Sequence, residues 1–170
     1  KATPLERGIE EDLAARMPLE SQFRNVNRQA SDPDFHDRLQ TAAFDRIISH
    51  NQGKLVFAYF WRSDKLPRLK DLLLARKLVR KYNDQPVALI FVSFDESEES
   101  WRKTLRKWGM SAGNHLRLAK GKEGSLAKRF GIESVPYYLI FDRAGKIALQ
   151  AEKLPANAEL KREIERIMDL

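Results

Sequence analysis

Two short and nearly continuous apolar segments constrain this fold most. The first, Leu55–Trp61, is a run of β-branched and aromatic residues, and the second covers residues 86–94. Such runs are typical of strands buried on both faces, because a strand with one wet face alternates apolar and polar residues. Residues 65–82 between them and residues 96–108 after them have helical spacing. The sequence therefore predicts βαβ units, in which parallel strands share one sheet with helices on its faces.

The flanking segments complete an α/β pattern. After the βαβ part we expect a strand, a helix, two strands of a hairpin and a final helix, over residues 115–118, 125–130, 137–141, 146–151 and 156–168. Ahead of it, residues 5–17 and 32–50 are predicted to be helices, and the second carries an apolar stripe that includes Leu39 and Phe44. We therefore divide the chain into an N-terminal helical extension, residues 1–50, and an α/β domain, residues 51–170.

Composition narrows the chemistry. The chain has 170 residues, of which 42% are hydrophobic, and it has no cysteine. A chain of this length buries roughly two-thirds of its unfolded surface, so one core is expected without support from disulfides or a metal. The lack of cysteine excludes dithiol exchange, peroxidatic thiols, Cys-ligated zinc, iron–sulfur clusters and c-type haem attachment. No spacing of histidines and carboxylates resembles a metal site, and we expect no cofactor.

Charge and hydropathy indicate whether nucleic acids or membranes are expected partners. With 31 Lys and Arg against 24 Asp and Glu, the net charge is +7, but the two signs are interspersed along the chain. We therefore expect no specific nucleic-acid partner. The longest apolar runs are far shorter than the roughly 20 residues of a membrane helix. Because the chain begins with Lys1 and not with Met, we expect a removed upstream piece, where a signal peptide or a membrane tether would lie.

No motif identifies an enzyme. The segment Gly109–Gly113 fits the GxSxG pattern of a nucleophilic serine, but that serine must follow a strand, and here a helix is predicted before it. The three histidines are dispersed. We nominate no catalytic residue.

Several local features do follow one another in a familiar order. They are a buried strand ending in Phe60-Trp61, a helix with Pro67 in its first turn, and the segment Gly131–Pro136 ahead of a hairpin. This order resembles the thioredoxin fold. It most resembles the TlpA/ResA-type redoxins, whose chains contain a pattern of the sort NFWASWCPPC, a strand ending in VSxD, a helix with an early Trp, and a GIxxxPxxxxxDxxGKI tail. The matching parts of this chain are, in order, Tyr59–Ser63, Val92–Asp95, Trp101 and Gly131–Ile147.

This resemblance covers roughly residues 53–170, and it implies a three-layer α/β/α thioredoxin-like fold with a mixed central sheet. The chain departs from the family at one point. The alignment places Lys65 and Arg68 where the family has its two cysteines. Neither side chain can attack a disulfide, so the family's dithiol activity is not carried over to this chain.

The resemblance also implies a binding face. In the family, the proline at Pro136 is in the cis form and faces the former dithiol, and the residue before it, here Val135, presents backbone groups to an extended peptide. Our first hypothesis is a redox-inactive module that binds a peptide or protein, in an extracytoplasmic setting that is periplasmic or membrane-anchored. The face would be formed by Trp61, Arg62, Asp64, Lys65, Pro67, Arg68, Val135 and Pro136.

Two other hypotheses stay open. In one, the chain is a thiol-independent enzyme or an anion-binding protein that holds an anionic ligand with Lys65 and Arg68, and Asp64 is the one nearby candidate for a general base. In the other, the chain is one domain of a larger protein and contributes only its shape. Trp61 has an equally simple interpretation as a core residue.

Overall fold

A computed structural model describes residues 32–65, 77, 81, 86–110, 113–153 and 157–169. The predicted helix over residues 5–17, most of the one over residues 65–82, and the site residues Pro67 and Arg68 lie outside these ranges. Residues from Asp37 onward form one compact unit. The sheet and the candidate site lie in the unit that starts at Asp37. The division of the chain at residue 50 stays a prediction.

The observed elements follow the predicted order. The helices are α3 (Pro33–His50), α5 (Glu98–Trp108), the 3₁₀ helix η1 (Gly121–Glu123), α6 (Ser125–Phe130) and α7 (Asn157–Met168). The strands are β1 (Leu55–Trp61), β2 (Val87–Ser93), β3 (Asn114–Arg117), β4 (Tyr137–Phe141) and β5 (Ile147–Ala151). Each of the helices and strands predicted within the described residues is confirmed to within two residues of its expected ends.

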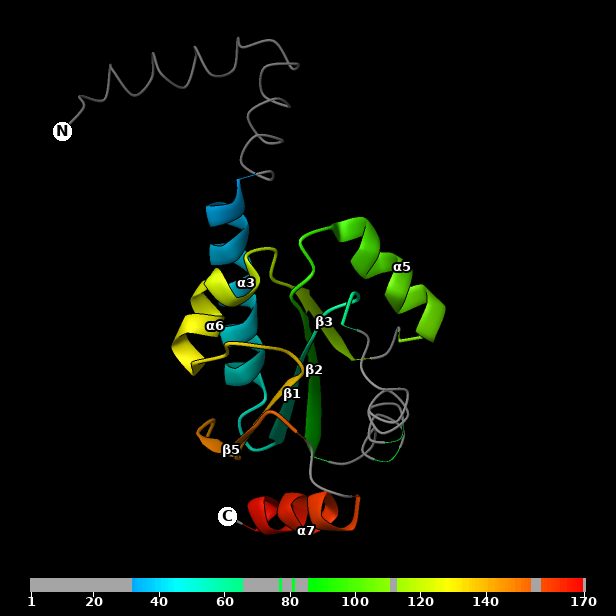
Figure 1. Ribbon diagram of the computed structural model, residues 1–170. Helices are drawn as coiled ribbons and strands as arrows, with labels where there is room; N and C mark the ends of the chain where they lie inside the picture. The colour runs from blue at the N-terminus through cyan, green and yellow to red at the C-terminus, as the bar shows by residue number, and fades with distance from the viewer. Residues whose placement is uncertain are drawn as a thin grey trace, which may run out of the picture. The chain divides into compact units, whose positions relative to one another are not determined.

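The five strands form one mixed sheet in the order β3-β2-β1-β4-β5 (Figure 1). β2 is parallel to both β1 and β3, whereas β4 pairs antiparallel with both β1 and β5. β1 lies at the centre, and all seven of its residues are buried. The prediction of a central strand buried on both faces is therefore confirmed.

Successive residues of β1 face two separate hydrophobic clusters, because side chains alternate across a strand. Val56, Ala58 and Phe60 pack with residues of α3 and α6 on one face of the sheet. Leu55, Phe57, Tyr59 and Trp61 pack with residues of α5 and α7 on the other. Figure 1 shows α3 and α6 together on one side of the sheet. The fold is thus the expected three-layer α/β/α arrangement.

Helix α3 corrects one detail of the predicted apolar stripe. Phe44 is buried, at 1% exposure, but Leu39 is 52% exposed. The two residues are five positions apart, which places their side chains about 140° apart around a helix, so they cannot face the same layer. The buried face instead continues from Phe44 through Ile47 and Ile48, which pack against the core.

A buried carboxylate ties α3 to the start of α6. Asp37 is only 6% exposed. It accepts hydrogen bonds from the backbone amide of Ser125, at 3.2 Å to Oδ2, and from the Ser125 hydroxyl. Gly124 lies directly against this carboxylate, because a Cβ there would stand 2.7 Å from Asp37 Oδ1.

The Gly124→Ala variant is expected to lose about 1–3 kcal/mol of unfolding free energy, because the added methyl group overlaps the Asp37 carboxylate. Urea denaturation measures the loss. In an Asp37→Ala background the overlap is gone, and the same glycine substitution should cost clearly less. An equal cost in both backgrounds would show that the carboxylate contact is not the reason.

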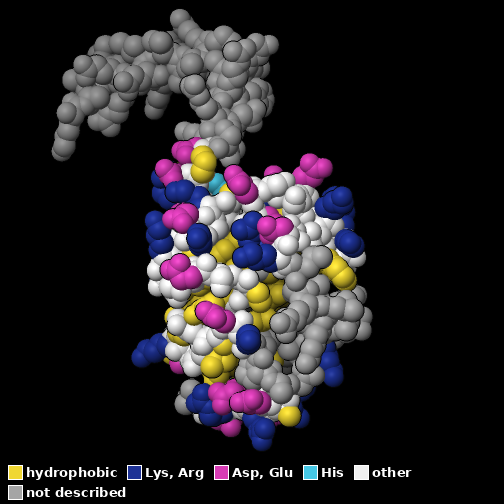
Figure 2. All heavy atoms as spheres, viewed as in Figure 1, with side chains coloured by type: hydrophobic (Ala, Val, Ile, Leu, Met, Phe, Trp, Pro, Cys, Tyr) yellow, Lys and Arg dark blue, Asp and Glu magenta, His cyan; other side chains and the backbone are white. Residues whose placement is uncertain are grey.

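The surface carries both charge signs. On the face in Figure 2, Lys and Arg side chains alternate with Asp and Glu side chains, and no region of a single sign dominates. In the part of the chain that the structure describes, no helix is both long enough and apolar enough to cross a membrane.

Candidate functional site

The carboxyl ends of two parallel strands meet at the candidate site. Trp61, the last residue of β1, is the register partner of Ser93, the last residue of β2. The amide of Phe94 donates to the carbonyl of Trp61 at 2.8 Å, and the amide of Leu118 donates to the carbonyl of Ser93 at 2.7 Å. The loops after β1, β2 and β3 are therefore held side by side, at the edge where open α/β sheets bind ligands.

Asp95 fixes the loop that follows β1. Its carboxylate accepts hydrogen bonds from the amide of Ser63 at 3.0 Å, from the Ser63 hydroxyl at 2.5 Å and from the Ser93 hydroxyl at 2.6 Å. Asp95 is only 6% exposed. Since buried polar groups stabilise a structure when their hydrogen bonds are complete, this carboxylate sets the path of the chain between Trp61 and Lys65.

Arg62 and Asp64 form a bidentate ion pair within that loop. Arg62 Nε donates to Asp64 Oδ1 at 2.9 Å, and Nη2 donates to Oδ2 at 2.7 Å. Arg62 therefore has its counterion two residues away in the same loop. Each carboxylate oxygen of Asp64 accepts one hydrogen bond from Arg62.

Trp61 lies in the core. Its side chain is 2% exposed and belongs to the cluster that also contains Tyr59, Tyr138 and residues of α7. The sequence allowed either a wall of the site or core packing for this residue. Its position in this cluster favours core packing.

The Val135–Pro136 peptide bond is cis, which confirms the expectation drawn from the family resemblance. The Val135 side chain is buried at 7% exposure. Tyr137, the first residue of β4, pairs with Phe60, and this pair ends the ladder between β1 and β4. Val135 lies two residues before Tyr137 and is therefore outside the ladder. Among the described residues, no hydrogen bond is formed by the backbone amide or carbonyl of Val135.

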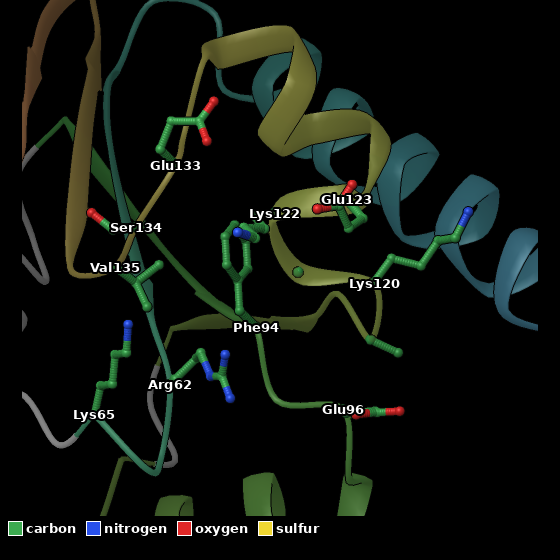
Figure 3. A pocket seen from close by; sticks show the side chains of 12 residues that line it. Arg62, Lys65, Phe94, Glu96, Lys120, Lys122, Glu123, Glu133, Ser134 and Val135 are labelled. Atoms are coloured by element: carbon green, nitrogen blue, oxygen red, sulfur yellow. The ribbon is translucent and has the colours of Figure 1, made fainter.

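A pocket of about 350 Å³ opens beside this segment (Figure 3). Its lining includes Arg62, Lys65, Phe94, Glu96, Ser134 and Val135. Three of the predicted site residues, Arg62, Lys65 and Val135, thus come together in one cavity. Trp61, Asp64 and Pro136 do not line it.

Sequence reasoning missed the other side of this pocket, which is formed by Phe94, Glu96 and the segment over residues 119–123 that includes η1. One signal could have indicated the first two residues, because they directly follow β2 at the carboxyl edge of the sheet. The segment over residues 119–123 carries no sequence motif that indicates a site. Among the residues that the structure describes, no group of three or more His, Asp and Glu side chains could hold a metal ion.

Comparison with known proteins places this fold. The model of the thioredoxin-like family matches residues 53–147. Two thiol-disulfide oxidoreductases named ResA, from Bacillus thuringiensis subsp. konkukian and from Bacillus cereus, are each 22% identical to this chain over 116 residues. These matches cover 68% of this chain and 65% of each relative, so the chain spans less than two thirds of their length.

Solved structures show the same fold. A thiol-disulfide oxidoreductase from Bacteroides fragilis superposes with a TM-score of 0.59 at 20% identity, over 65% of this chain and 82% of that one. The thioredoxin domain of a thiol-disulfide oxidoreductase from Bacteroides vulgatus does so with a TM-score of 0.59 at 24% identity, over 69% of this chain and 81% of that one.

The sheet order, the three layers and the cis proline agree with these likenesses, and the family match covers more than half of the chain. The chain has no cysteine, so it lacks the cysteine pair of the TlpA/ResA pattern wherever the two positions fall. This chain is a member of the thioredoxin-like family that lacks the cysteine pair.

Proposed function

We propose that this chain is a redox-inactive thioredoxin-like domain that binds an extended peptide segment of another protein. The binding face comprises Arg62, Lys65, Val135 and Pro136. The backbone amide and carbonyl of Val135 form no hydrogen bond with any residue that the structure describes, and they lie next to a pocket of about 350 Å³. This observation carries the proposal. A guest strand gains affinity from main-chain hydrogen bonds, and a neighbouring pocket selects one of its side chains.

Dithiothreitol alone reduces the disulfides of insulin slowly. The purified chain is expected not to increase the rate of this reduction. The reason is chemical, because exchange requires a thiolate and this chain has no cysteine. Turbidity from precipitating insulin chains measures the reaction. The matched control is the double variant Lys65→Cys, Arg68→Cys, which restores the spacing of the family motif and should gain turnover. Turnover by the unaltered chain above the reagent rate would contradict redox inactivity.

Peptide binding is tested by selecting end-blocked peptides from a randomised display library on the unaltered chain. The affinity of a selected peptide is then measured by calorimetry. Methylation of alternate amide nitrogens of that peptide is expected to weaken binding by up to about tenfold, because it removes the hydrogen bond that a guest amide donates to the carbonyl of Val135. Methylation of the amides between them should matter less, since those face away from the domain. If no peptide is enriched, or if both methylation patterns are harmless, strand addition is wrong.

We also propose an extracytoplasmic setting for the domain. The support is its likeness to the TlpA/ResA-type redoxins, and it is independent of the binding proposal. Fractionation of source cells tests this setting. Recovery in the envelope fraction is the expected result, and recovery only with cytoplasmic marker proteins would contradict it.

A further inference from the structure

The charges around the pocket indicate which guest side chain it selects. We infer that the pocket binds a carboxylate of the guest peptide between the guanidinium of Arg62 and the ammonium of Lys65. This inference rests on the proposed peptide-binding function and adds the class of ligand. Neither the thioredoxin-like fold nor the missing cysteines require such a preference.

The first argument is the geometry of Arg62. A guanidinium can hold two carboxylates, one along its Nε–Nη2 edge and one along its Nη1–Nη2 end. Asp64 occupies the first edge with both of its oxygens. Arg62 lines the pocket and Asp64 does not. The Nη1–Nη2 end is therefore the one that we assign to a ligand in the pocket. Within the described part of the chain, Nη1 of Arg62 has no hydrogen-bond partner.

The second argument is the position of Lys65. Its side chain is exposed, lines the same pocket and forms no ion pair with any described residue. Figure 3 shows the ammonium of Lys65 pointing toward Val135 and the guanidinium of Arg62 lying near Phe94. A guest strand paired with Val135 would therefore bring a side chain between two cations.

The remaining walls fit an acidic side chain with an apolar stem. Phe94 is 5% exposed and packs against Gly121, so its ring gives the pocket an apolar floor. Three carboxylates, Glu96, Glu123 and Glu133, also line the pocket, together with Lys120 and Lys122. In Figure 3, Glu96 and Glu133 point away from the guanidinium of Arg62, and Glu123 lies on the opposite side of the pocket, beside Lys122. The positive charge at one end of the pocket therefore comes from Arg62 and Lys65, and not from the net charge of the chain.

The test is an NMR titration of the ¹⁵N-labelled chain with three short peptides. The peptides are acetyl-Ala-Ala-Glu-Ala-Ala-amide, the same peptide with Gln in place of Glu, and acetyl-pentaalanine with a free carboxyl end. We expect saturable shifts at the amides of Arg62, Lys65 and Val135 with the Glu peptide, and about tenfold weaker binding of the Gln peptide. The third probe distinguishes a side-chain carboxylate from a terminal one, since either supplies the same group.

Four variants distinguish a specific effect of the pocket residues from an effect of the net charge of the chain. Arg62→Gln and Lys65→Gln should each weaken the Glu peptide about tenfold. Lys103→Gln removes the same charge from the exposed face of α5 and should leave binding unchanged. Asp64→Asn removes the counterion of Arg62 and should leave binding equal or tighter, because Asp64 does not line the pocket.

Each contrary outcome has its own meaning. Equal affinity for the Glu and Gln peptides overturns the carboxylate inference and leaves peptide binding intact. Equal weakening by Arg62→Gln and Lys103→Gln overturns it as well, because the effect is then one of net charge. If none of the probes binds, the inference is wrong, and the display selection described above decides separately whether the domain binds peptides at all.

Discussion

Replacement of Phe44 with alanine is expected to lower the free energy of unfolding by about 3–5 kcal/mol. The ring is 1% exposed and lies against three other aromatic rings, with centroid distances of 6.3 Å to Phe60, 5.8 Å to Phe130 and 6.0 Å to Phe141. Its removal leaves a cavity between α3, α6 and the sheet, because interlocked rings relax only partly into the vacated space. Urea denaturation followed by circular dichroism measures the change.

The matched control lies on the same helix. Leu39 is 52% exposed, so Leu39→Ala should change the free energy of unfolding by less than about 0.5 kcal/mol. Where Phe44→Ala fails to fold, Phe44→Leu provides a milder measurement, with an expected loss of about 1–2 kcal/mol. If Phe44→Ala cost no more than Leu39→Ala, α3 would not be an integral part of the core.

Replacement of Asp95 with alanine is expected to lower the free energy of unfolding by about 2–4 kcal/mol. The carboxylate accepts three hydrogen bonds, two from Ser63 and one from Ser93, and its loss leaves these donors without their acceptor. The same change should loosen the loop that holds Arg62 and Lys65. Amide hydrogen exchange at Ser63 is therefore expected to accelerate more than exchange in the centre of β1.

Two variants separate the role of Asp95 from its charge. Asp95→Asn keeps one acceptor oxygen and should lose less stability than Asp95→Ala. Glu99→Ala removes a charge from the exposed first turn of α5, and it should change stability by less than about 0.5 kcal/mol. An Asp95→Ala variant as stable as Glu99→Ala, with unchanged exchange at Ser63, would show that the carboxylate does not anchor the loop.

The order of the elements was predictable because it depends on patterns along the chain. The continuous apolar run of β1 indicated burial on both faces, and its residues do alternate between the two core clusters. The hairpin between β4 and β5 has Gly145 at a φ of +79°, where the tight turn was expected. Turn chemistry and hydrophobic period are local properties, so a sequence carries them without knowledge of the fold.

The site was predictable only in part, and through resemblance. The cis bond before Pro136 was expected from the family pattern and is present. The ion pair of Arg62 with Asp64 was not expected, because two residues of opposite charge in a loop form a pair only when the backbone turns them toward each other. The apolar stripe assigned to α3 included Leu39 for a related reason, since a pattern of apolar residues does not show which of them the neighbouring layer reaches.

The sequence by itself determined the fold class, the positions of most described elements and the absence of any cysteine for thiol chemistry. These follow from residue type and spacing, which act over a few positions. The tertiary structure alone decided the burial of Trp61, the anchoring of Ser63 by Asp95 and the joining of two loops into one pocket. Ser63 and Asp95 are 32 positions apart, and Asp37 and Ser125 are 88 apart. Contacts over such separations depend on how the layers pack, and no local pattern in the chain records them.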